Sequence, residues 1–196
     1  MSVATRINAM PLPSPWLLGA AFGLSEFGLS LLRRSGSTAS KEDQGSLRLI
    51  WRVILLCMVA ATVLWQTLPQ AQIPMTLAAS SSALAIFTFG LVLRWYSIYY
   101  LGKYFTVDVA VVADQKVIDT GPYRLIRHPS YAGSLLEFFG FGLYLANVAS
   151  ILVLIVPISI VFLRRISIEE GVLAKALGQP YIDYMRRTRR LIPFVY

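Results

Sequence analysis

The sequence is poor in side chains that bind metals or form cross-links. Its 196 residues include one cysteine and one histidine. The cysteine, Cys57, lies inside an apolar run, and the chain has no second thiol for an internal disulfide or a cysteine-rich metal site. The single histidine, His128, also argues against a zinc or two-metal centre. A reaction built on protein-bound metals is therefore disfavoured.

Charged residues are scarce as well. They make up 14% of the chain, whereas hydrophobic residues make up 56%, a balance unlike that of a soluble domain. The composition predicts an all-α, polytopic integral membrane protein. The chain is expected to form a single domain, 1–196, because it is too short for a membrane anchor plus a soluble catalytic domain. Any active site is then built from the membrane helices and their loops.

The hydropathy pattern predicts five spans, since a helix needs about 20 mostly apolar residues to cross the hydrocarbon core. They are 15–32, 51–68, 75–101, 131–146 and 149–163. The first contains Gly19-x-x-x-Gly23, a pattern that seats a neighbouring helix. Only Asn147-Val148 separates the last two spans, which predicts a tight antiparallel hairpin, and Pro157 is expected to kink the fifth helix.

The distribution of Lys and Arg predicts the orientation. Basic residues gather after the first, third and fifth spans, whereas the connections 69–74 and 147–148 contain none. By the positive-inside rule, the N-terminus is expected outside and the C-terminus in the cytosol. The net charge of +8 is thus mostly a consequence of topology and is no indication of nucleic-acid binding.

Two groups of polar motifs fall on the predicted cytosolic edge. The segment 121–133 reads GPYRLIRHPSYAG, and Pro129 is expected in the first turn of the fourth helix. The N–H groups at such a helix start favour a negative ligand group. The second group begins with Glu169-Glu170 on a cytosolic continuation of the fifth helix, 166–178, which Gly178 is expected to cap.

The second group ends in a predicted short helix, 180–190, followed by the sequence Arg190-x-x-Pro193. The lone histidine, the paired carboxylates and the terminal arginines therefore meet at one membrane edge. Such a site suits an anionic or zwitterionic cofactor that meets a lipid-like substrate.

Together these motifs resemble the isoprenylcysteine carboxyl methyltransferase family. The resemblance rests on Arg127-His128-Pro129-x-Tyr131, the two glutamates, and the Tyr181-x-x-Tyr184 and Arg190-x-x-Pro193 ending, and it covers 101–193. More loosely, the motifs resemble the wider group with phospholipid N-methyltransferases. The resemblance implies three N-terminal transmembrane helices (1–100), a catalytic half (101–196), S-adenosylmethionine as cofactor and a lipophilic or prenylated acceptor that enters from the bilayer. The compact chain resembles prokaryotic members, which implies an inner-membrane location.

The resemblance also assigns residues to roles. The implied cofactor-binding residues are Gln115, Val117, Ile118, Tyr123, His128, Pro129, Tyr131, Gly133, Glu169 and Glu170. The implied substrate-binding residues are Arg190, Glu137 and Tyr184, with Arg190 and Glu170 in catalytic roles. A guanidinium at position 190 suits a planar carboxylate.

Other interpretations stay open at this stage. Leu177 and Arg189 stand where the family commonly has Phe and a small residue. A sterol-reductase-type enzyme with a nicotinamide cofactor shares a similar box, and a non-catalytic protein on the same fold is a third hypothesis. A soluble Rossmann-type methyltransferase is excluded, because no Gly-x-Gly-x-x-Gly loop follows a strand.

Three charged residues fall within the predicted spans. Glu26 and Glu137 are expected to face a cavity or a partner, since membrane-embedded carboxylates are costly. Arg94 is expected to snorkel toward the cytosol.

Overall fold

The computed structural model describes residues 12–32, 45–107, 109, 111 and 114–196. Helices account for all the regular structure in these ranges, in agreement with the predicted all-α class. The helices are α2 (Pro15–Leu32), α3 (Ser46–Thr67), α4 (Leu77–Leu101), α5 (Pro129–Tyr144), α6 (Val148–Leu177) and α7 (Gln179–Arg187). Short 3₁₀ turns occur at η1 (Pro69–Ala71), η2 (Gly102–Tyr104) and η3 (Gly121–Arg124).

Three segments are long and apolar enough to cross a membrane within the described ranges. They are Ser46–Thr67, Leu77–Tyr104 and Val148–Leu177. The other two predicted spans correspond to α2, with 18 residues, and α5, with 16. The fold is thus that of an all-helical integral membrane protein, and the count of five spans stays a prediction.

The helix boundaries follow from local sequence signals. Pro129 opens α5 in its first turn, as predicted. The fifth span and its predicted continuation form one helix, α6, which passes through Pro157 without a break. Gly178 ends α6 with φ +63°, the left-handed conformation that favours glycine, as predicted. Helix α7 ends at Arg187, three residues earlier than predicted, because Thr188 has extended backbone angles.

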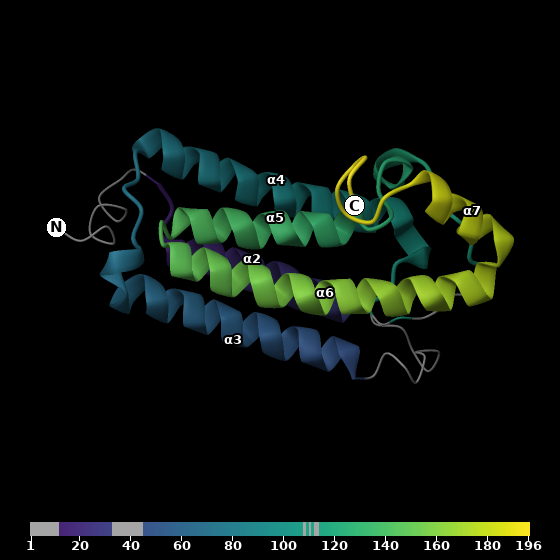
Figure 1. The fold of residues 1–196 in the computed structure, drawn as a ribbon, viewed down its shortest axis with the longest axis horizontal. Helices are drawn as coiled ribbons and strands as arrows, with labels where there is room; N and C mark the ends of the chain where they lie inside the picture. The colour runs from purple at the N-terminus through teal and green to yellow at the C-terminus, as the bar shows by residue number, and fades with distance from the viewer. Residues whose placement is uncertain (1–11, 33–44, 108, 110, 112–113) are drawn as a thin grey trace.

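The long helices lie side by side, with α5 between α4 and α6, and α3 along the outer side of α6 (Figure 1). At one end of the bundle, the connection after η1 pairs with the α5–α6 turn through a bridge between Gln72 and Asn147. Asn147 also caps α6, because its side chain accepts a hydrogen bond from the Ser150 N–H. Helix α7 and the C-terminal residues lie at the opposite end (Figure 1). The basic and motif-bearing segments of the C-terminal half therefore share one end of the bundle.

The closest helix contact joins α4 and α5 through glycines. A Cβ atom added at Gly90 would lie 2.6 Å from the Gly133 carbonyl oxygen, and one added at Gly140 would lie 2.5 Å from the Phe87 backbone nitrogen. The predicted role of Gly19-x-x-x-Gly23 is wrong. A Cβ at Gly23 meets no described atom within 4 Å, and one at Gly19 meets only the tip of Met58. Small residues do seat a neighbouring helix here, but in a different pair of helices.

We expect Gly90→Ala to destabilise the protein by about 1–3 kcal/mol, because the neighbouring atoms are backbone and cannot rotate away. Thermal unfolding in detergent measures the loss. Gly23→Ala is the matched control, since alanine favours a helix over glycine and nothing obstructs its methyl group. Equal melting temperatures for the two variants would contradict the close α4–α5 contact.

Candidate functional site

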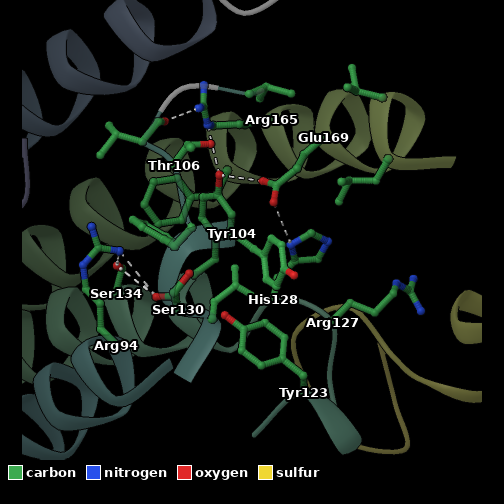
Figure 2. Close-up of a pocket in the computed structure, with 18 of the residues that line it drawn as sticks. Arg94, Tyr104, Thr106, Tyr123, Arg127, His128, Ser130, Ser134, Arg165 and Glu169 are labelled. Carbon is green, nitrogen blue, oxygen red and sulfur yellow. Dashed lines mark hydrogen bonds and ion pairs between the residues drawn. The ribbon is translucent and has the colours of Figure 1, made fainter. Parts of the chain in front are cut away.

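A cavity of about 150 Å³ lies at the α7 end of the bundle. Its walls come from all six helices, α2 to α7, and from the segment between α4 and α5. Figure 2 shows its polar part, where His128, Glu169, Arg165 and Tyr123 surround the space. Deeper in the bundle the walls are apolar and are made by Phe22, Leu29, Ile50, Ile54, Phe138 and Phe162. One cavity thus joins a polar compartment to an apolar one.

The backbone around His128 is held by the C-terminal segment. The N–H of Arg127 donates to the carbonyl of Arg189 at 2.7 Å, and that of His128 donates to the carbonyl of Arg190 at 3.0 Å. Ile126 and Arg189 form a parallel bridge beside them. The two motif groups, about 60 residues apart in sequence, are therefore joined directly through main-chain hydrogen bonds.

Glu170 is the charged centre of this junction. Its side chain is 3% exposed. Its Oε1 accepts a hydrogen bond from Arg127 Nε at 2.8 Å and lies 3.3 Å from His128 Nε2. Its Oε2 accepts from Arg190 Nε at 3.0 Å and from Nη2 at 2.7 Å. These bonds hold the pKa of Arg190 above its ordinary value. Glu170 does not line the cavity.

Glu169 has the opposite setting and faces the cavity (Figure 2). Its Oε2 accepts a hydrogen bond from the Tyr131 hydroxyl at 3.1 Å, and that hydroxyl accepts one from Arg165 Nε at 3.0 Å. Its Oε1 lies 4.0 Å from His128 Nδ1, beyond hydrogen-bond distance. The side chain is 30% exposed. Glu169 therefore offers a carboxylate oxygen to a ligand in the cavity.

Buried tyrosines close the polar compartment at the α7 side. The Tyr184 hydroxyl donates to the Tyr123 carbonyl at 2.7 Å, and the Tyr123 hydroxyl donates to the Ser97 carbonyl at 3.2 Å. Burial raises the pKa of both phenols above the ordinary value. Both hydroxyls are therefore neutral donors at physiological pH and do not act as bases.

The structure brings most of the predicted site residues together. Those that line the cavity are Gln115, Val117, Ile118, Tyr123, His128, Tyr131, Glu169 and Tyr184. The others lie behind the wall. Pro129 is buried in the first turn of α5, and Gly133 packs on the backbone of Arg94. Arg190 bonds Glu170 and the Tyr196 hydroxyl. Glu137 is fully buried, and neither carboxylate oxygen has a hydrogen-bond partner among the described residues.

Several lining residues escaped the sequence prediction. Arg165 lies four residues before Glu169 on the same face of α6, so helical spacing from the glutamate was the signal that would have found it. Tyr104 and Thr106 come from the loop after α4, where no periodic pattern marks a wall position. Arg94 does not snorkel as predicted. It points into the bundle, where it bonds Glu26 and lines the cavity.

Comparison with known proteins gives a family. The profile of a family described as phospholipid methyltransferase matches residues 78–180. The chain is 31% identical to protein-S-isoprenylcysteine O-methyltransferase B of Arabidopsis thaliana over 59% of this chain and 60% of the relative. It is 32% identical to a probable protein-S-isoprenylcysteine O-methyltransferase of Oryza sativa subsp. indica over 54% of this chain and 56% of the relative.

A solved structure is also similar. It is a eukaryotic intramembrane Ras methyltransferase, an isoprenylcysteine carboxyl methyltransferase. The TM-score is 0.62 and the sequence identity 27%, over 76% of this chain and 53% of the other. The chain thus spans a little over half the length of the relatives it matches. The predicted resemblance to isoprenylcysteine carboxyl methyltransferases is confirmed, and the chain belongs to the phospholipid methyltransferase family.

Proposed function

We propose that this protein transfers a methyl group from S-adenosylmethionine to a carboxylate of a lipophilic, prenylcysteine-like acceptor. The observation that carries the proposal is the cavity, which joins a polar compartment to an apolar one inside a helical membrane fold. A charged donor and a lipid acceptor need two such compartments in contact. The names of the relatives support this reaction class.

The polar compartment has the groups that this donor requires. Glu169 offers a carboxylate oxygen to an ammonium or a ribose hydroxyl. The irregular segment at Lys116, Val117 and Ile118 lines the same space and offers backbone groups to a planar base. Tyr123, Tyr181 and Tyr184 add aromatic surface. We assign donor binding to these residues and to His128, and we assign Glu170 and Arg190 to the frame that positions them.

The charge of the cavity favours an anionic acceptor. The ionised side chains on its walls, among the described residues, are Glu26, Arg94, Lys116, Arg127, Arg165 and Glu169. Glu26 and Arg94 neutralise each other, and Arg127 pairs with Glu170 behind the wall. The remaining groups, Lys116 and Arg165 against Glu169, still leave a basic excess. Such a wall attracts a carboxylate and repels an ammonium headgroup. This balance favours carboxylate methylation over phospholipid N-methylation.

This reaction requires mainly that the protein align the two reactants and exclude water. The bound donor supplies an electrophilic methyl group on a sulfonium. An ionised carboxylate needs no base to accept the methyl group, so the neutral phenols of Tyr123 and Tyr184 do not hinder the reaction. Holding both reactants in line and excluding water therefore provides most of the rate enhancement. The apolar walls made by Phe138 and Phe162 keep the reacting end dry.

The proposed location is the prokaryotic inner membrane, with the polar compartment facing the cytosol. The connections that lack Lys and Arg meet at the end of the bundle opposite α7. The arginines of α6 and α7 lie at the donor end. The positive-inside rule then places the C-terminus in the cytosol, where the donor is made.

We expect the purified protein to bind S-adenosylmethionine and not NADPH in calorimetry. With labelled donor, it should methylate an S-farnesylcysteine in preference to phosphatidylethanolamine, because the cavity walls are basic. Binding of NADPH alone would move the function to a reductase. Methylation of phosphatidylethanolamine alone would retain the donor and overturn the carboxylate acceptor.

We expect Glu169→Gln to weaken binding of S-adenosylmethionine about 10- to 100-fold, since a charged hydrogen bond contributes about 1.5–3 kcal/mol. The melting temperature of the unliganded variant should change little, because the side chain is 30% exposed. Asp183→Asn is the control, as that carboxylate is exposed at 57% and lies outside the cavity. Equal affinity in both variants would remove Glu169 from the donor site.

Glu170→Gln should act on stability instead. The neutral amide would leave the guanidinium of Arg127, 9% exposed, without its counter-charge. We expect a loss of about 3 kcal/mol in the free energy of unfolding. Arg187→Gln breaks the exposed pair with Asp119 and should cost about 0–1 kcal/mol. Thermal unfolding of both variants in detergent distinguishes the buried frame from a surface pair.

A further inference from the structure

One charged pair on the cavity wall has no part in the function proposed above. Glu26 of α2 and Arg94 of α4 both line the cavity. Arg94 Nη2 donates to Glu26 Oε2 at 2.7 Å, and Arg94 Nε lies 2.6 Å from Glu26 Oε1. The side chains are 12% and 6% exposed, for Arg94 and Glu26 respectively. A carboxylate thus meets a guanidinium through both oxygens inside the membrane part of the bundle.

Packing alone does not require this pair. The cavity face of α2 carries Phe22, Glu26 and Leu29, at the spacing of one helix face. An apolar residue at position 26 would continue that face without desolvating a charge, and buried ion pairs are often no more stable than apolar replacements. Charges at membrane depth are costly and mark functional sites. The pair therefore calls for a role in binding.

We propose that Glu26 is an internal stand-in for the acceptor carboxylate. Glu26 pairs with the guanidinium of Arg94, and the acceptor carboxylate takes its place there on binding. This inference rests on the proposed function, which supplies a carboxylate on a lipophilic acceptor. Glu26 meets the guanidinium through one hydrogen bond and one ion-pair contact, and an acceptor carboxylate can meet the same group.

Arg94 keeps its position when Glu26 leaves. Its Nη1 donates to the Ser134 hydroxyl at 2.5 Å and lies 3.5 Å from the Ser130 carbonyl oxygen, both on α5. Ser130 lies next to Tyr131, whose hydroxyl bonds Glu169 at the donor end. A carboxylate on Arg94 thus lies about one helical turn from the donor compartment, with its apolar chain toward Phe22 and Phe138.

The other arginines at the α7 end are held differently. Arg127 bonds Glu170 and the carbonyls of Met185 and Thr188, and Arg190 bonds Glu170 and Tyr196 outside the cavity. Arg165 holds the Tyr131 hydroxyl and the Val107 carbonyl. Glu137, fully buried on α5, does not line the cavity. Arg94 bonds a carboxylate that lines the cavity together with it.

If the exchange occurs, substitutions of Glu26 and of Arg94 change the affinity for an acceptor carboxylate in opposite directions. The test measures dissociation constants of two probes for the full chain in detergent, an N-acetyl-S-farnesylcysteine and its neutral carboxamide. Arg94→Gln should weaken carboxylate binding about 10- to 100-fold, since a charged hydrogen bond is lost. Glu26→Gln should tighten it about 10-fold, because the internal competitor loses its charge. Binding of the carboxamide should change less than threefold in either variant.

A pair that only fastens α2 to the bundle gives a different result. Both variants would then weaken both probes together, and this would overturn the exchange. If Arg94→Gln fails to fold, Glu26→Gln decides alone, because tighter carboxylate binding supports the proposal and unchanged or weaker binding refutes it. The readout needs no turnover. Failure of the wild type to bind S-adenosylmethionine would refute the proposed function separately.

Discussion

The buried carboxylate of Glu170 is the interaction on which the site depends. It neutralises Arg127 and Arg190, which come from segments about 60 residues apart, and it also lies beside His128. Each of these groups would be costly to bury alone, and removing one partner leaves the others uncompensated. The backbone hydrogen bonds between 127–128 and 189–190 hold the same junction in register. The polar end of the cavity therefore has walls fixed by one charge cluster rather than by packing alone.

The two adjacent glutamates of α6 have different surroundings. Successive residues on an α-helix point about 100° apart, so one side chain can enter the wall while its neighbour faces the cavity. Glu170 accepts hydrogen bonds from the arginines of the frame, whereas Glu169 reaches the cavity and bonds Tyr131. A doubled carboxylate in the sequence thus corresponds to one structural and one ligand-facing group. This arrangement fixes the wall while one carboxylate still faces the cavity.

Much of the fold was predictable, because apolar runs and helix-end signals are local. The first span matched α2 in both bounds, and Gly178 ended α6 as expected. The glycine prediction failed because the Gly19-x-x-x-Gly23 pattern gives only the spacing of two glycines. Close contact depends on whether the glycine face of the helix packs against another helix, as it does at Gly90 and Gly140. Arg190 was assigned to the substrate from the family motif. Its partner Glu170 lies 20 residues away, and no local pattern reveals that the two are bonded.

The same limit explains why the cavity wall was only half predicted. The N-terminal helices show no motif, yet Phe22, Glu26 and Leu29 of α2 form part of the cavity. A single charged residue in an apolar helix indicates that its burial is costly, but it does not indicate which residue pairs with it. The sequence could therefore predict that Glu26 faces a cavity, but not that it bonds Arg94. Charges inside a membrane are costly and mark functional sites, so a carboxylate and a guanidinium that line one cavity motivate the proposed exchange. The exchange would keep Arg94 paired with a carboxylate when an acceptor binds, and it requires that the Glu26 carboxylate, 6% exposed, gain a proton or another partner.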